Sequence, residues 1–115
     1  MDDLTAGYLK QYLWYSPTTG ELRWKPREGS ESFNTRWADQ PALTAVNHNG
    51  YMHGLLFHRP VLAHKAIWTM VYGKYPRHHI RHKNGDKTDN RLSNLVSSPN
   101  HAHLYLPSDA LMFRN

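Results

Sequence analysis

The chain contains no cysteine, and none of its apolar runs approaches the roughly 18 residues of a membrane span. Without thiols, disulfide frameworks, thiolate zinc fingers, iron–sulfur clusters and cysteine nucleophiles are excluded. Histidine, carboxylate and amide groups therefore remain for any site chemistry. The first ten residues, MDDLTAGYLK, are acidic at the start, where a secretory signal peptide is basic. These absences predict one small soluble domain over residues 1–115, located in the cytoplasm or associated with the nucleoid.

Positive charge and histidine are abundant in this short chain. It has 14 lysines and arginines against 9 aspartates and glutamates, a formal net charge of +5, and 9 histidines. Clustered cations gain free energy when they release counterions from a phosphate backbone, so the charge favours a polyanionic partner. Histidine exchanges protons near neutral pH and binds metals, so its enrichment favours a catalytic site.

The N-terminal part predicts a short helix followed by a small sheet. Apolar residues at helical spacing indicate a helix over 4–14, which ends before Ser16-Pro17. Period-two alternation or hairpin signals place strands at 21–25, 42–47 and 51–58, and Asn47–Gly50 supplies the hairpin turn. We expect these three strands to form one antiparallel sheet. Residues 26–41 are polar and predict irregular structure.

The segment from Pro60 to Gly73 predicts an amphipathic helix. His64, Lys65 and Thr69 fall on one arc of a helical wheel, opposite Ile67 and Met70, and Gly73 is a typical helix stop. With so few aliphatic residues, the core needs large aromatic contributions. We therefore expect Trp24 and Trp68 to pack between sheet and helix.

The most specific pattern lies between Arg77 and Val96, which reads RHHIRHKNGDKTDNRLSNLV. It resembles the HNH endonucleases, also called ββα-metal or His-Me finger nucleases, and especially the small phage homing-type members. In that family a strand ends in histidine, a loop reads N-G-x-x-x-D-N-R, and N-L enters a second strand before a helix. The segments TGELRWK at 19–25 and AHKAIW at 63–68 are also similar to those proteins.

The resemblance implies an α+β fold, in which a small antiparallel sheet with a packing helix precedes a ββα-metal motif. The scaffold and DNA-binding part would occupy residues 1–75, the motif 76–106, and a tail 107–115. The implied activity is metal-dependent hydrolysis of phosphodiester bonds in double-stranded DNA. The implied source is a phage, which would place the protein in the host cell cytoplasm.

The resemblance also assigns roles within the motif. His82 would be the general base, since an unperturbed imidazole is mostly neutral at pH 7. Asn94 would be the amide that supports the active-site geometry, and His103 would bind a divalent cation, Mg²⁺ or Mn²⁺. Asn100 and His101 remain alternative ligands in place of His103.

One position departs from the family pattern. Many members have aspartate, a metal ligand, immediately before the general-base histidine, and this chain has Arg81. A guanidinium does not ligate a cation, so either another group such as Asp89 or Asp86 substitutes, or the metal is held weakly, or the protein is a poor nuclease. In relatives that carry arginine at this position, the side chain would bind a phosphate. A zinc cluster of neighbouring histidines is disfavoured, because adjacent strand residues point to opposite faces.

The predicted DNA contacts are cations near the hairpin and the His82 loop. They are Arg23, Lys25, Arg27, Arg59, Lys65, Arg81, Lys83, Lys87 and Arg91. Residues that read bases are expected in 26–41 or in the N-terminal region. A monomer with one site would nick DNA, whereas a homodimer would break both strands. The alternative function is an inactive HNH-like module that binds DNA or protein, and a plain basic structural protein is a third possibility.

Overall fold

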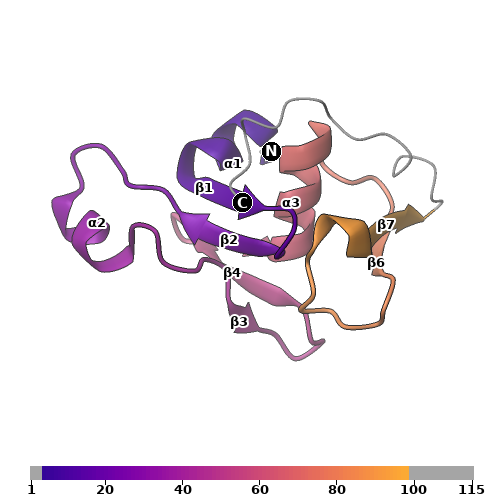
Figure 1. Cartoon of the computed structure of the whole chain (residues 1–115). Coiled ribbons are helices and arrows are strands. Elements are labelled where there is room, and N and C mark those ends of the chain that lie inside the picture. Colours follow the sequence, from indigo (N-terminus) through magenta and orange to yellow (C-terminus); the bar gives the residue numbers. More distant parts are fainter. Residues whose placement is uncertain (1–3, 99–115) are drawn as a thin grey trace.

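The computed structural model of the chain describes residues 4–98. Its elements are α1 (Ala6–Tyr12), β1 (Leu13–Ser16), β2 (Glu21–Trp24), α2 (Glu31–Trp37), β3 (Ala45–Val46), β4 (Met52–Leu56), β5 (Arg59–Leu62), α3 (Ala63–Tyr72), β6 (His79–His82), a 3-10 turn (Leu92–Asn94) and β7 (Leu95–Ser98). Within these residues the strands form the antiparallel sheets β1–β2, β3–β4–β5 and β6–β7 around the central helix α3 (Figure 1). The fold class is α+β, as the sequence predicts.

The first helix is shorter than the helical spacing indicates. Its N-terminus is capped by Thr5, whose Oγ1 accepts a hydrogen bond from the backbone N–H of Tyr8 at 3.1 Å. It ends at Tyr12, and β1 follows directly because Leu13 and Tyr15 are buried in alternation. The strand predicted at 21–25 exists as β2, but it pairs with β1. The prediction that it joins the 42–58 hairpin was wrong.

The hairpin predicted around Asn47–Gly50 is confirmed. The Oδ1 of Asn47 accepts hydrogen bonds from the backbone N–H groups of Asn49 and Tyr51, which fixes the turn between β3 and β4. The third strand of this sheet is β5, which contains Pro60 opposite Leu55. Pro60 was predicted to open the following helix, and this prediction was wrong, because the helix begins at Ala63.

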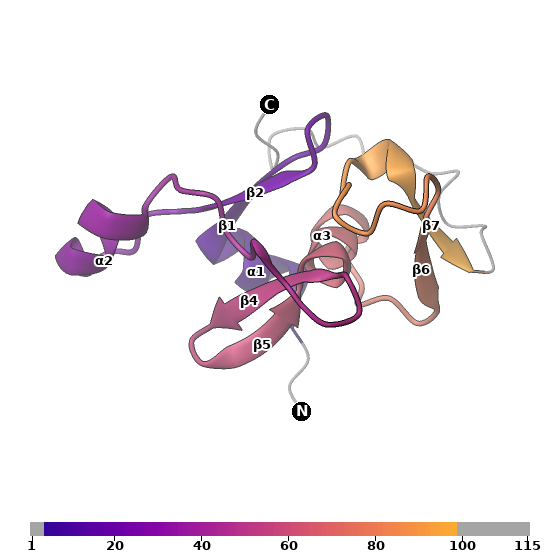
Figure 2. The ribbon, with the colours of Figure 1, turned by 90° about the horizontal axis from the view of Figure 1, so that it is seen from below.

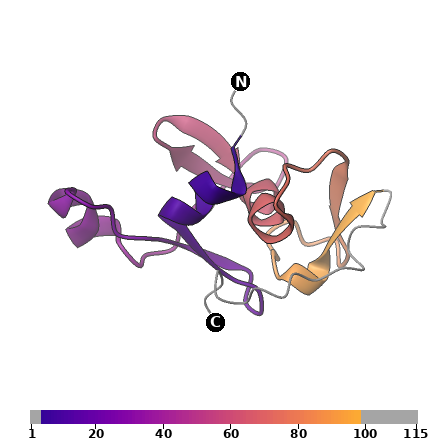
Figure 3. The same cartoon turned by 90° about the horizontal axis from the view of Figure 1, so that it is seen from above.

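Residues 31–37 form α2, in a region where the sequence predicts only irregular structure. No α2 residue is buried, so the segment lacks the periodic apolar face by which a helix is recognised from sequence. The helix projects from the body of the molecule and lies on the side away from β6 and β7 (Figures 1 and 3).

The helix α3 ends where the sequence predicts. Gly73 adopts a left-handed conformation with φ of 82°, and its N–H donates to the carbonyl of Thr69 at 2.9 Å. The predicted polar arc was wrong at two positions, because His64 and Thr69 are buried. The physical reason is that this helix is covered on more than one side, by α1 and by β4 and β5, and lies at the centre of the molecule (Figure 2).

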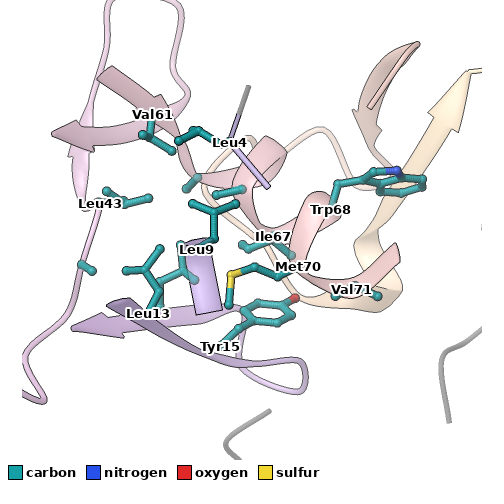
Figure 4. Close-up of a cluster of buried hydrophobic side chains, with 14 of the residues drawn as sticks. Leu4, Leu9, Leu13, Tyr15, Leu43, Val61, Ile67, Trp68, Met70 and Val71 are labelled. Atoms are coloured by element: carbon teal, nitrogen blue, oxygen red, sulfur yellow. The ribbon is translucent and has the colours of Figure 1, made fainter. Parts of the chain in front are cut away.

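The main core lies between α1, β1 and α3. Leu9, Leu13, Tyr15, Ile67 and Met70 gather there (Figure 4). Burying each such side chain contributes about 1.5–3 kcal/mol relative to exposure. This core fixes β1, and with it the ring of Tyr15, relative to the central helix.

The two tryptophans assigned to the core differ in burial. Trp68 is buried in α3 and packs beside Tyr72, with ring centroids 4.4 Å apart, as predicted. Trp24 is only half-buried, and its ring lies against Phe33 of α2.

Candidate active site

The predicted general base lies at the end of a strand and faces inward. Along β6 burial alternates, so Ile80 and His82 point into the protein while His79 and Arg81 are exposed. His82 pairs in register with Leu95 of β7, which confirms the two strands that the motif predicts. Because successive side chains of a strand point to opposite faces, the His82 imidazole lies in the interior and Arg81 points to solvent.

One ring nitrogen of His82 is held by Asn90. Nε2 lies 2.8 Å from Asn90 Oδ1, and both side chains are buried. The Asn90 Nδ2 is directed at Met52 Sδ at 3.8 Å, which assigns the amide oxygen to the imidazole. Since an amide oxygen only accepts, Nε2 carries the proton in the neutral ring. This tautomer leaves Nδ1 as the basic nitrogen.

Asn90 is itself positioned by the N-terminal hairpin. The hydroxyl of Tyr15 donates to the Asn90 carbonyl at 2.6 Å in a buried hydrogen bond. Burial raises the pKa of the Tyr15 hydroxyl above its usual range, so the group remains a proton donor. The core residue Tyr15 thus connects β1 to the group that orients His82.

The β1–β2 turn makes a second close contact with the same loop. The carbonyl of Pro17 accepts the backbone N–H of Leu92 at 3.0 Å. Gly20 has φ of 82°, and a Cβ at this position would lie 2.5 Å from the backbone nitrogen of Arg91. Only glycine fits both the backbone conformation and this approach. The hairpin and the loop therefore pack backbone against backbone.

Asn94 supports the loop rather than the imidazole. Its Oδ1 accepts the backbone N–H of Asn84 at 3.1 Å, and its Nδ2 donates to Asn84 Oδ1 at 3.0 Å and to the carbonyl of Asp89 at 2.8 Å. The backbone carbonyl of Asn94 also accepts from Lys83 at 2.8 Å. These bonds close the segment from Asn84 to Asn94, with Gly85 at φ of 80° in its turn.

An aromatic wall covers one side of His82. The His64 ring stacks on Tyr51 at 4.8 Å between centroids and meets the His82 ring edge-on at 5.4 Å. Burial, together with the smaller effect of the nearby His82, lowers the pKa of His64 to about 4. His64 is therefore neutral at pH 7 and adds no positive charge beside the predicted base.

Carboxylates and cations line the exposed side of the loop. Asp89 pairs with Arg91 at 2.7 Å and accepts from Asn84 at 2.8 Å, and its hydrogen bonds to Arg91 hold the pKa of Asp89 well below its usual range. A hydrogen bond from the Thr88 hydroxyl likewise lowers the pKa of Asp86. Both acids are ionised at neutral pH, and their oxygens already accept hydrogen bonds within the loop.

The predicted DNA-contacting cations lie in three places. Four are exposed around the His82 loop, namely Arg81, Lys83, Lys87 and Arg91. Lys87 also reaches the turn before β4, where Nζ donates to the Asn49 carbonyl at 2.9 Å. On and after β2, Arg23 pairs with Glu21 at 3.1 Å and Lys25 donates to the Lys10 carbonyl, so both have partners within the protein. Arg59 begins β5.

The metal prediction depends on residues outside the described part. His103, together with the alternatives Asn100 and His101, lies beyond residue 98. Among residues 4–98 no three His, Cys, Asp or Glu side chains group closely enough to hold a metal ion. Arg81 occupies the position where many family members supply a carboxylate, and it does not ligate cations. The described residues do not by themselves build a metal site.

The contacts of Asn90 and Tyr15 at the site were not predicted from the sequence. Asn90 was visible only as part of the D-N-R motif, and no periodicity connects it to a histidine eight positions earlier. The contact from Tyr15 spans 75 positions and leaves no local signal.

The antiparallel β6 and β7, with His82 facing inward at the end of β6, are compatible with the two strands of a ββα finger. Residues 61–105 match a family model described as HNH endonuclease. This match confirms the resemblance found in the motif: residues 61–105 are similar to the HNH endonucleases. The match begins within β5 and includes all of α3. No curated protein and no solved structure matches the chain.

Within residues 4–98, every helix is too short to cross a membrane.

Proposed function

We propose that this protein is an HNH endonuclease that hydrolyses phosphodiester bonds of double-stranded DNA. The observation that carries the proposal is the buried pair of His82 and Asn90 inside the segment that matches the family. Hydrolysis of a phosphodiester needs a base that activates water and a group that holds this base in one orientation. His82 and Asn90 fit these two roles.

In the proposed reaction His82 Nδ1 accepts a proton from the attacking water. The Asn90 oxygen accepts a hydrogen bond from the Nε2–H group and so stabilises the imidazolium that forms, while the Tyr15 hydroxyl keeps Asn90 in place. Asn94 maintains the loop that carries Asn90. The exposed side chains of Arg81 and Arg91 are positioned at the surface of the same motif, where phosphate contacts would hold the duplex.

A divalent cation, Mg²⁺ or Mn²⁺, would stabilise charge on the leaving oxygen when bound. We assign His103 as its protein ligand from the family pattern, with phosphate oxygens and waters completing the shell. From the same resemblance we propose a phage-encoded, homing-type enzyme that acts in the host cytoplasm, nicking one strand as a monomer or cutting both as a homodimer.

The test is cleavage of supercoiled plasmid with Mg²⁺ or Mn²⁺, beside an EDTA lane. We expect open-circle or linear product that EDTA abolishes. His82→Ala should slow cleavage by roughly 10²- to 10⁴-fold, the usual contribution of a general base. His79→Ala is the matched control, since His79 lies on the same strand with an exposed side chain. Equal cleavage by the His82→Ala protein would refute the proposal.

A second function is favoured by one observation. Arg81 stands where many members have a metal-binding aspartate, and it is exposed beside His82. An HNH-like module that has lost its metal would bind DNA without cutting it. Intact plasmid in every lane, together with a salt-sensitive gel shift that needs no metal, would favour this function.

A further inference from the structure

A groove of about 420 Å³ lies where α2 meets the turn between β4 and β5. Its lining combines aromatic and apolar side chains with one cation, Arg27, and we call these residues the Arg27 cluster. The cluster consists of Trp24, Arg27, Phe33, Trp37, Leu55 and Phe57. Since α2 projects on the side away from β6 and β7, this cluster is separate from the candidate active site (Figure 1).

Arg27 is held among aromatic rings without a counterion. Its guanidinium carbon lies 3.7 Å from the ring centroid of Phe33, 4.4 Å from that of Phe57 and 5.4 Å from that of Trp24. Within residues 4–98 its Nε is buried without a hydrogen-bond partner, and no carboxylate pairs with it. A guanidinium stacked in this way keeps its in-plane donors available for an oxyanion.

The backbone around Arg27 is fixed. Asn34 of α2 accepts the Arg27 N–H with Oδ1 at 2.7 Å and donates with Nδ2 to the Arg27 carbonyl at 2.8 Å. The short helix α2 is thereby tied to the loop that carries the cation. The cluster is consequently a preorganised surface, because both α2 and the loop are held by these bonds.

Apolar side chains surround this cation at the surface. Leu55 is 60% exposed, Phe57 50% and Trp37 44%, which makes three of the five exposed large hydrophobic side chains of residues 4–98. Exposed apolar groups concentrated in one place mark an interaction site more often than scattered ones do.

The turn that displays Phe57 is strained. Phe57 and His58 have φ of 51° and 67°, in a two-residue turn where Asn-Gly is the favoured sequence. A bulky residue in the left-handed region costs about 1–3 kcal/mol. The turn thus keeps an exposed phenylalanine at a cost in stability.

We propose that the Arg27 cluster is a second DNA-contacting surface, in which Arg27 pairs with a phosphate while Phe57 and Trp37 pack against a base step of the minor groove. This inference rests on the proposed function. Proteins that bind the minor groove often combine Arg or Lys side chains with an apolar side chain that inserts between base steps, and the Arg27 cluster offers both. Arg36, whose guanidinium carbon lies 5.4 Å from the Trp37 ring centroid, adds positive charge at the rim. The net charge of +5 favours DNA over a protein partner.

The test measures binding without cleavage. Fluorescence anisotropy of a labelled duplex, three helical turns long and of random sequence, is recorded in EDTA over a series of salt concentrations. Trp37→Ala and Phe57→Asn should weaken binding by roughly 5- to 100-fold, the worth of one aromatic contact to a base, with an unchanged salt slope. Phe57→Asn suits the turn conformation, so lost affinity would not reflect a disrupted hairpin.

Two further variants complete the experiment. Arg27→Gln should reduce the slope of log K against log salt by about 0.9, as the loss of one phosphate contact predicts. Tyr75→Ala is the matched control, since Tyr75 is an aromatic residue that is also 44% exposed but lies outside the cluster. It should bind like the wild type.

Three results would overturn the proposal. Wild-type affinity of the Trp37→Ala and Phe57→Asn proteins would exclude this surface, even if the protein cuts DNA. A wild-type dimer in sedimentation that Trp37→Ala dissociates, with unchanged DNA affinity, would identify an interface between copies. A wild-type protein that neither binds nor cuts duplex DNA would refute the proposed function as well.

Discussion

Asn90→Ala is the sharpest perturbation of the candidate site. It removes the oxygen that lies 2.8 Å from His82 Nε2 in a buried environment. A buried N–H left without an acceptor costs about 1–3 kcal/mol. The neutral imidazole avoids this cost by moving its proton to Nδ1, which is the nitrogen that must accept the proton of water. At about 1.4 kcal/mol for each factor of ten, the cleavage rate should fall by roughly 5- to 150-fold.

The assay is the initial rate of plasmid cleavage, paired with ¹⁵N chemical shifts of the imidazole, which distinguish the two tautomers. Asn49→Ala is the control, since Asn49 is exposed in the β3–β4 turn and contributes its backbone groups to the hydrogen bonds there. Circular dichroism confirms that each variant is folded. A folded Asn90→Ala protein that cleaves at the wild-type rate, or that keeps the proton on Nε2, would refute the reasoning.

Three other predictions concern stability. Gly20→Ala should lower the free energy of unfolding by more than about 1 kcal/mol, because residue 20 has a positive φ and the added Cβ would lie 2.5 Å from a backbone nitrogen. Gly7→Ala in α1 should raise the free energy of unfolding by about 0.5–1 kcal/mol, since nothing lies near the added Cβ. Equal effects of the two substitutions in calorimetry would contradict this prediction. Burial lowers the pKa of His64 to about 4, so as the pH falls His64 is protonated in the unfolded chain before it is protonated in the folded one. The free energy of unfolding should therefore decline by at most about 3 kcal/mol between pH 6.5 and pH 4. In chemical denaturation at a series of pH values, His64→Gln should reduce this decline. Asn94→Ala removes three hydrogen bonds of the loop and should accelerate amide exchange at residues 84–90 by at least about tenfold, and unchanged protection would show that other contacts hold the loop.

The parts of the fold that the sequence predicts are those with local signals. Gly73 marks the end of α3, and Asn47–Gly50 marks the hairpin, because each needs a backbone conformation that few residues adopt. The start of β1 at Leu13 was not predicted, because the apolar residues of 4–14 have helical spacing. Leu13 is extended because it pairs with Trp24 of β2, which lies outside this segment. The helix α2 was missed because it buries none of its residues.

In the candidate site, too, the features with a local sequence signal were predicted and the others were not. The motif identified His82 and its strand, since the histidine and the N-G loop are adjacent in sequence. It did not reveal that Asn90 contacts the imidazole while Asn94 holds the loop, because both are asparagines in one turn and only the backbone path distinguishes them. The strained conformation of Phe57 and His58 was also not predictable, since neither residue type signals a positive φ.

The bond from Tyr15 to Asn90 also determines when the site assembles. The two residues are 75 positions apart, so their contact requires the closure of a long loop and forms only as distant parts of the chain come together. The strands β6 and β7 pair residues that are near in sequence, but the hydrogen bond that holds the Asn90 backbone comes from the distant β1. The working geometry of the proposed base therefore depends on both ends of the described chain, and a fragment without β1 would lack the bond that holds Asn90.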